Sequence, residues 1–543
     1  MPPRTAAYHA RPKGSTRPKS QRPGVVALTA PSAMKLTYDT LLHMISLFSY
    51  AREAMPLIAT CRVLYHEGAK IALKKSVEIL DAGQLASFLK FLRADNSSRC
   101  RSLRQLELWG FYTESEVVQE LLETIPLLVN IQYLRLVNAE ELLECDPAVP
   151  TMLAALTSLR HINVSGAKRV TCALLSSLQS PLSSATIDFI SDDAVDIWDH
   201  LDIDQWPRYH PATLLANFAS TLEELECVAW STTSDTVIPE KVYPNMRKLS
   251  IEVHDLPLRM DPFIRAFPHL TNLQVHAGNY RGPICYFDLE VMRASHEANV
   301  GQQLTSCGTW TRLEHFTGDL VDLYAIGLTC HISRIVIEDD VEDELRLDML
   351  ATVLRYARPL HLKFKGISNS ILDNSERSFI STLRSECAST LLNLDLRIYF
   401  EEEDQDKDLR VVIDNLVSTL TCLRLKFLQL RFDTDNLDPT PMTKNVFERM
   451  MCLRHGLPEP PELTPVPLTP AELSLNSLDM DALMGRLESI PSLEAALVVL
   501  PSSRDEGDIV ERTITKGTSR LAGEEQWRHW LPSGKNPNPF LQY

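Results

Sequence analysis

The stretch Leu103-Arg104-Gln105-Leu106-Glu107-Leu108 carries the pattern that decides the fold of this chain. Its first, fourth and sixth positions are apolar, and the other three positions are polar. Side chains of a strand alternate between the two faces of a sheet, so the last two leucines share one face and the polar residues face the other side. The same string returns 28 residues later as Ile131-Leu134-Leu136, and after 28 more as Leu159-Ile162-Val164. Recurrence at a fixed period predicts a stack of similar units, each with one strand.

Further copies of this string occur along most of the chain. The clear copies are Leu222-Leu225-Cys227, Met246-Leu249-Ile251, Leu270-Leu273-Val275, Ile332-Ile335-Ile337, Leu391-Leu394-Leu396 and Leu425-Leu428-Leu430, and the weaker ones are Leu182-Ala185-Ile187, Leu313-Phe316, Leu360-Leu362 and Leu493-Ala496-Val498. Such a string at this period is typical of leucine-rich repeats. We therefore expect an α/β fold, a curved solenoid with a parallel sheet on its concave side and helices or coil on its convex side. Longer spacings, of 40 residues before Leu225 and 43 before Phe316, predict either an insertion or one undetected unit each.

Composition excludes several classes of protein. The 543 residues carry a formal charge of −17, which argues against a general nucleic-acid binder, because such a protein needs a basic surface. Apolar runs such as Ala495–Leu500 are far shorter than the ~18 residues of a membrane helix, so no membrane partner is expected. Eleven scattered cysteines without metal-ligand spacing predict a reducing compartment, the cytoplasm or nucleus.

The sequence divides into five segments. We expect a disordered, basic, proline-rich tail (1–33), a helical module (34–75), an irregular leucine-rich-repeat domain (76–457), a proline-rich linker or loop (458–471), and a terminal repeat with a C-terminal cap (472–543). The tail region has seven Lys or Arg residues through Lys35, and no acidic residue precedes Asp39. Within the repeats, the acidic run Glu401–Asp408 predicts a solvated loop. Trp527 and Trp530 are expected to pack on the last repeat, whose open flank needs a cap.

Two short stretches give the helical module its character. Leu36–Phe48 resembles the opening of the F-box motif, and Leu57–Tyr65 is similar to its second half, although Thr37 replaces the usual proline and Thr40 an apolar residue. The resemblance implies that the module binds a Skp-type adaptor through apolar side chains. The expected adaptor-binding residues are Leu36, Leu41, Met44, Ile45, Leu57, Cys61, Leu64 and Tyr65. An ordinary helical hairpin is the alternative interpretation.

Together, the module and the repeats resemble the F-box/leucine-rich-repeat proteins. That resemblance implies the substrate-recognition subunit of an SCF-type cullin-RING E3 ubiquitin ligase, linked to a cullin through the adaptor. Such a subunit performs no bond chemistry; it raises the concentration of a protein substrate near the ubiquitin-loaded enzyme. The alternative, from another class, is a leucine-rich-repeat interaction scaffold or inhibitor that never enters a ligase. An enzyme with an unrecognised site is a third interpretation.

The polar positions of the strands predict where a protein or peptide substrate binds. These side chains point away from the core onto the concave surface. The expected substrate-binding residues are Trp109, Tyr133, Arg135, His161, Lys248, His276, Arg397 and Tyr399. Aromatic and arginine side chains are common anchors of protein interfaces, whereas a nucleic acid would require mostly Lys and Arg. The alternative is that a solvated strand face is polar in any case.

No pattern in the sequence predicts catalysis. The phosphate loop, the nucleophile elbow and the paired-histidine zinc helix are all missing from the sequence. His161, His276, His315 and His361 fall on strand positions expected to face solvent, and Cys227 falls on a core position. We therefore expect no catalytic residue, metal or cofactor.

Overall fold

The computed structural model describes residues 37–94, 96–110, 115–190, 208–230, 241–253, 258–277, 289–372, 377–421, 423–434, 437, 451–455, 468–500 and 510–516. Leu36, the basic tail, most of the proline-rich segment, and both Trp527 and Trp530 lie outside these residues, so the predictions made for them stay predictions.

The central element is an open, fifteen-stranded sheet whose strands follow one another in chain order. Its strands are β1 (Ser76–Ile79), β2 (Gln105–Trp109), β3 (Tyr133–Val137), β4 (His161–Val164), β5 (Ser184–Asp188), β6 (Glu224–Trp230), β7 (Lys248–Val253), β8 (Asn272–Ala277), β9 (Arg312–Gly318), β10 (His331–Val341), β11 (His361–Ser368), β12 (Asn393–Tyr399), β13 (Phe427–Asp433), β14 (Ala495–Leu500) and β15 (Val510–Thr515). All neighbours pair in parallel except β14 and β15, which are antiparallel. The predicted mixed α/β class with a parallel sheet is confirmed at this level.

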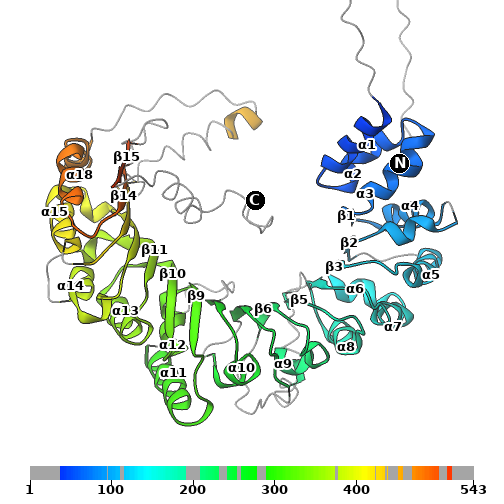
Figure 1. The fold of residues 1–543 in the computed structure, drawn as a ribbon, viewed down its shortest axis with the longest axis horizontal. Helices are drawn as coiled ribbons and strands as arrows, with labels where there is room; N and C mark the ends of the chain where they lie inside the picture. Colours follow the sequence, from blue (N-terminus) through cyan, green and yellow to red (C-terminus); the bar gives the residue numbers. More distant parts are fainter. Residues whose placement is uncertain are drawn as a thin grey trace, which may run out of the picture.

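The helices lie along the outer side of an arc, or at its first end in the case of α1 to α3, and the strands form the inner side (Figure 1). They are α1 (Tyr38–Leu47), α2 (Ala51–Ile58), α3 (Ala69–Ala72), α4 (Ala82–Arg93), α5 (Ser115–Thr124), α6 (Ala139–Glu144), α7 (Ala148–Ala154), α8 (Arg169–Ser177), α9 (Pro211–Leu214), α10 (Asp261–Ala266), α11 (Leu289–Gln302), α12 (Leu320–Ala325), α13 (Glu344–Ala357), α14 (Phe379–Arg384), α15 (Leu409–Leu420), α17 (Pro470–Asn476) and α18 (Met480–Glu488). None of the helices in the described ranges is long and apolar enough to cross a membrane.

The register of the sheet follows the repeated string. Leu106 pairs with Leu134, and Leu134 pairs with Ile162, so equivalent apolar residues stand side by side. In every predicted string, including the weak copies, the apolar residues that follow the first one lie in one of the strands β2 to β14. Because β5 pairs directly with β6, and β8 with β9, the long spacings of 40 and 43 residues are insertions rather than undetected units.

One continuous core joins all of these elements. It runs from Ile45 in α1 to Leu500 in β14 and includes the strand residues that face the helices and the apolar faces of the helices. In β2, for example, Leu106 and Leu108 are 4% and 1% exposed, and Leu121 of α5 is 4% exposed. The alternation of buried and partly exposed residues along the strands is the pattern on which the fold prediction rested.

Buried polar side chains tie successive units together on the helical side. The carboxylate of Glu140 in α6 accepts hydrogen bonds from the backbone N–H groups of Lys168, Val170 and Thr171 at 3.2, 2.7 and 3.0 Å, around the start of α8. Asn299 of α11 bonds the backbone of Leu258, Met260 and Ala325 on both sides of its own unit. Neither Glu140 nor Asn299 belongs to a repeated string, so the repeat pattern does not predict these hydrogen bonds.

The two ends of the sheet and one loop differ from expectation. At the first end, β1 carries Val77 and Ile79, but no leucine stands three residues before Val77. At the other end, the final strand β15 runs antiparallel to β14, whereas a further repeat would add a parallel strand. The acidic run is solvated except for Asp404. This residue is 2% exposed, accepts hydrogen bonds from Asn369 and Lys407, and so is part of the packed structure.

Candidate binding surfaces

The N-terminal helices form a small core of their own that merges with the sheet. Ile45 of α1 and Leu64 of the π-helical turn η1 (Leu64–Gly68) are both 0% exposed. A Cβ atom on Gly68 would lie 2.7 Å from Ile45 Cδ1, so a larger residue there would require the buried Ile45 side chain to shift. Ile45 and Leu64 were predicted to bind an adaptor. Their burial corrects that assignment, because they hold the helices together and offer no surface to a partner.

The outer surface of the same helices is unusually apolar. Seven of the 19 exposed large apolar side chains of the described residues lie within residues 38–65. They are Tyr38, Met44, Leu47, Tyr50, Met55, Val63 and Tyr65, and we call them the apolar helix surface. Met44 and Tyr65 were predicted, whereas Leu41, Leu57 and Cys61 are half-buried against the core. The other five were missed, because the helical periodicity in the sequence mainly marks the inward face.

Thr37 and Thr40 have a local structural role. Thr37 is the N-cap of α1, and its hydroxyl accepts a hydrogen bond from the Thr40 backbone N–H at 3.2 Å. Such a cap satisfies one of the N–H groups that a helix start leaves unpaired. The start of α2 is stabilised in a similar way, because Glu53 Oε2 accepts hydrogen bonds from the backbone N–H groups of Ser49 and Tyr50.

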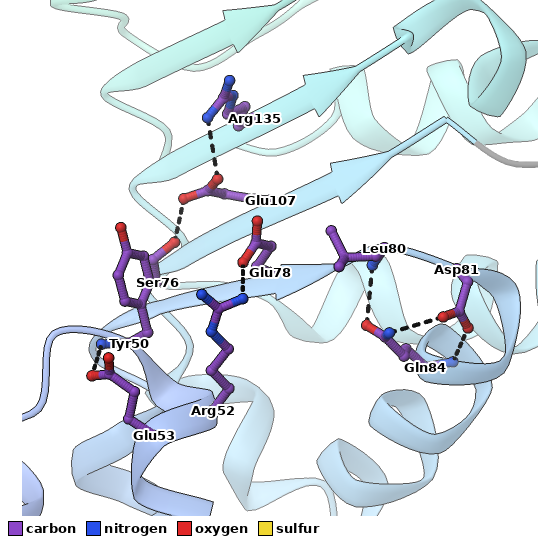
Figure 2. Close-up of polar contacts among 10 residues, drawn as sticks. All are labelled: Tyr50, Arg52, Glu53, Ser76, Glu78, Leu80, Asp81, Gln84, Glu107 and Arg135. Carbon is purple, nitrogen blue, oxygen red and sulfur yellow. Dashed lines mark hydrogen bonds and ion pairs between the residues drawn. The ribbon is translucent and has the colours of Figure 1, made fainter. Parts of the chain in front are cut away.

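A line of polar contacts connects the helices to the first strands (Figure 2). Arg52 of α2 forms an ion pair with Glu78 of β1 at 2.8 Å. Also on β1, Ser76 donates a hydrogen bond to Glu107 of β2, which pairs in turn with Arg135 of β3 at 3.4 Å. The Arg135 and Glu107 side chains are only 15% and 14% exposed, so this predicted substrate anchor is already engaged within the sheet.

The predicted substrate-binding residues fall into three groups along the inner face. Trp109, Tyr133, Arg135 and His161 lie on the adjacent strands β2, β3 and β4, with Tyr133 directly beside His161 and Trp109 at the other end of β2. Lys248 and His276 lie on the adjacent strands β7 and β8. Arg397 and Tyr399 lie on β12, four strands further along the sheet. A single small ligand therefore cannot contact all three groups at once.

Tyr399 is not the exposed anchor that strand alternation predicted. It is 9% exposed, and its ring lies against Gly366 of β11, where a Cβ atom would come within 3.1 Å of Tyr399 Cδ1. Burial, followed by the nearby Glu342 carboxylate, raises the pKa of the Tyr399 hydroxyl. Neighbouring Arg397 does remain exposed and pairs with Asp433. Tyr399 thus belongs to the packed part of the sheet.

The histidines on the inner face differ in their surroundings. His161 is exposed as predicted, whereas His276, His315 and His361 are half-buried. Burial, with a smaller contribution from the Arg334 charge, lowers the pKa of His315 to about 4, and the same two causes lower the pKa of His361. These two rings are therefore uncharged at neutral pH.

A hollow of about 270 Å³ opens on the inner face over β5 to β9. The short side chains of Ser184, Thr186, Ser250 and Thr317 leave this space. Glu224, Glu226, Lys248, Asn272, Gln274 and His315 also line it. Lys248 pairs with Glu224 at 2.5 Å, and Thr186 donates a hydrogen bond to Glu226 at 3.2 Å. The repeated strings predict which strand positions face the inner side, but they do not predict that these short side chains lie near one another.

Two cysteines of the sheet region are buried thiols. Burial raises the pKa of the Cys227 thiol well above its usual value and that of Cys330 to about 11, so neither is a thiolate at neutral pH. Cys227 is 0% exposed, as its predicted core position requires. No group of three or more metal-ligating side chains occurs within the described ranges.

These two surfaces, the apolar helix surface and the polar inner face, are the candidate functional sites. Comparisons with known proteins found no matching family model and no matching curated protein.

Proposed function

We propose that this chain is the substrate-recognition subunit of an SCF-type cullin-RING E3 ubiquitin ligase. The F-box-like helices α1 to η1 bind a Skp-type adaptor, which links the chain to a cullin. The inner face of the leucine-rich-repeat sheet binds a protein substrate. The chain itself performs no bond chemistry and acts by holding the substrate near the ubiquitin-loaded enzyme.

The observation that carries this proposal is the concentration of exposed apolar side chains on the N-terminal helices. Exposed apolar side chains that gather in one region of a protein mark interaction sites, because they are costly to leave in water. Leu47 is 70% exposed and Tyr38 is 55% exposed, although Ile45 anchors the same helix in the core. Burying one such leucine against a partner is worth about 2 kcal/mol, or roughly thirtyfold in affinity.

The separation of the two surfaces also supports the proposal. The apolar helix surface lies at the first end of the arc, while the hollow lies over β5 to β9 (Figure 1). An adaptor at one place therefore leaves the other open to a substrate. The mixed polar character of the inner face suits a protein partner.

The test is association of the full chain with a purified Skp-type adaptor. We expect micromolar or tighter binding, lost in Leu47→Glu. The matched control is Leu304→Glu in the π-helical turn η7 (Gln303–Cys307), since Leu304 is 68% exposed and distant from α1 in the chain. Retained binding in Leu47→Glu, or equal loss in both variants, contradicts the assigned surface. No association of the unmodified chain contradicts the ligase proposal and favours a scaffold or inhibitor.

A further inference from the structure

Negative charge gathers on the inner face beside the hollow. Asp188 of β5, Glu224 and Glu226 of β6, and Glu252 of β7 lie on this face. Among the described residues of these three strands, Lys248 is the one cation on the same face, and it already pairs with Glu224. The hollow therefore presents a net negative surface that no described residue covers.

The chain itself contains a segment of opposite charge. Residues 1–35 hold seven Lys or Arg residues and no Asp or Glu. Five of the seven fall within residues 11–22, the stretch Arg-Pro-Lys-Gly-Ser-Thr-Arg-Pro-Lys-Ser-Gln-Arg. The prolines in this stretch favour extended conformations, which fit a long shallow surface at a low cost in conformational entropy.

The segment is long enough to reach the hollow. Fourteen residues lie between Arg22 and Thr37, where the described structure begins at the start of α1. The fifteen Cα–Cα steps from Arg22 to Thr37 can extend to about 50 Å at ~3.3 Å per step. From β1 to β6 the sheet spans five strand spacings, or about 24 Å at ~4.8 Å each, which leaves about 25 Å for the distance from Thr37 to β1.

We propose that residues 11–22 bind across the hollow over β5 to β7 of their own chain, with basic side chains near Glu224 and Glu226, and so compete with partner proteins for this surface. The short side chains of Ser184, Thr186 and Ser250 provide the room. This self-occupancy goes beyond the proposed function, and it requires no adaptor.

The expected strength is modest but sufficient. Exposed ion pairs are individually weak, so a free peptide with five cations should bind with a Kd on the order of 1 mM. Attachment to the same chain gives the segment an effective concentration of about 1 mM. The tail then occupies its site about half of the time, which weakens binding of a competing peptide about twofold.

The first experiment measures binding of a fluorescent peptide of residues 11–22 to the full chain. Its comparison is the full chain with Arg11, Lys13, Arg17, Lys19 and Arg22 all changed to Gln. We expect the peptide to bind this variant about twofold more tightly than the unmodified chain. Equal affinities would overturn the proposal; if binding still depended on Glu224 and Glu226, the occupant would instead be a basic segment of another protein.

The second experiment locates the site within the tail-neutralised chain. Glu224→Gln together with Glu226→Gln should weaken peptide binding roughly fivefold, as expected for two exposed charges. The matched control is Glu402→Gln with Glu403→Gln, an exposed acidic pair in the turn Glu402–Asp404. Equal weakening by both pairs would overturn the assignment to the hollow. Because no adaptor is present, either failure leaves the proposed ligase function untouched.

Discussion

Asn299 offers the sharpest test of how the irregular part of the sheet is held together. It lies on α11, within the 43-residue spacing between the strings of β8 and β9, and is 1% exposed. Its Oδ1 accepts a hydrogen bond from the Met260 backbone N–H at 3.0 Å. Its Nδ2 donates to the carbonyls of Leu258 at 2.9 Å and Ala325 at 3.0 Å. One side chain thus bonds the backbone of the units before and after its own.

The change Asn299→Ala leaves these three backbone groups without their partner in a buried place. An unsatisfied buried polar group costs about 1–3 kcal/mol. Water entering the small space left by the amide offsets part of that cost, so we expect a loss of about 3 kcal/mol in the free energy of unfolding. With an m-value of about 3 kcal/mol/M, the urea midpoint falls by about 1 M.

The assay combines urea unfolding with hydrogen exchange at the Met260 amide. Glu297→Ala is the control, because Glu297 is exposed on the same helix. We expect Asn299→Ala to lower the midpoint and to speed exchange at Met260, while the control changes neither. An unchanged midpoint with unchanged exchange at Met260 would refute the reasoning, since it would mean that the three bonds contribute nothing to holding α11 in place.

Three further predictions follow from local geometry. Gly318→Ala should destabilise the fold by about 2 kcal/mol or more in urea unfolding, because Gly318 has φ +152° and its Cβ would lie 2.0 Å from Val275 O, whereas Gly301→Ala, with open space around it, should not. Burial lowers the pKa of His210 to about 3, so between pH 6.5 and pH 3 only the unfolded chain takes up the proton. The free energy of unfolding should therefore fall by about 2 kcal/mol from pH 7 to pH 5. The variant His210→Asn should show a smaller fall over the same pH range. Replacing Trp109 and Tyr133 by Ala should weaken substrate capture in pull-downs while adaptor binding survives; loss of both would show that these residues hold the fold.

The strands were predictable because each is specified locally. Alternation within a string gives the buried face, and the spacing between strings gives the unit, so even the weak copy at Leu182-Ala185-Ile187 identified β5. Register followed because equivalent apolar residues must align to share one core. The first strand escaped because Leu73 precedes Val77 by four residues instead of three. The antiparallel β15 escaped because it repeats no string.

The site was less predictable because exposure depends on neighbours that are distant in sequence. Met44 and Ile45 are neighbours on one helix, yet Met44 is 41% and Ile45 is 0% exposed. Apolar periodicity marks both as candidates, and the position of Gly68 and Ile58 beside Ile45 decides which is core. Likewise, Arg397 and Tyr399 share a strand face, but Gly366 on the next strand makes room that buries the tyrosine ring.

The irregular connections and the hollow occur in the same part of the sheet. The 40-residue spacing joins β5 to β6 and the 43-residue spacing joins β8 to β9, so the two insertions bracket the strands that form the hollow. Asn299 and Gln303 of the second insertion both bond backbone of the following unit, which fixes that insertion to the outer side of β8 and β9. Ser184 and Thr186 line the hollow from the strand before the first insertion, and Thr317 lines it from the strand after the second. The hollow therefore lies where the sheet departs from its regular period, and the bonds of Asn299 and Gln303 hold the second insertion in a fixed position there.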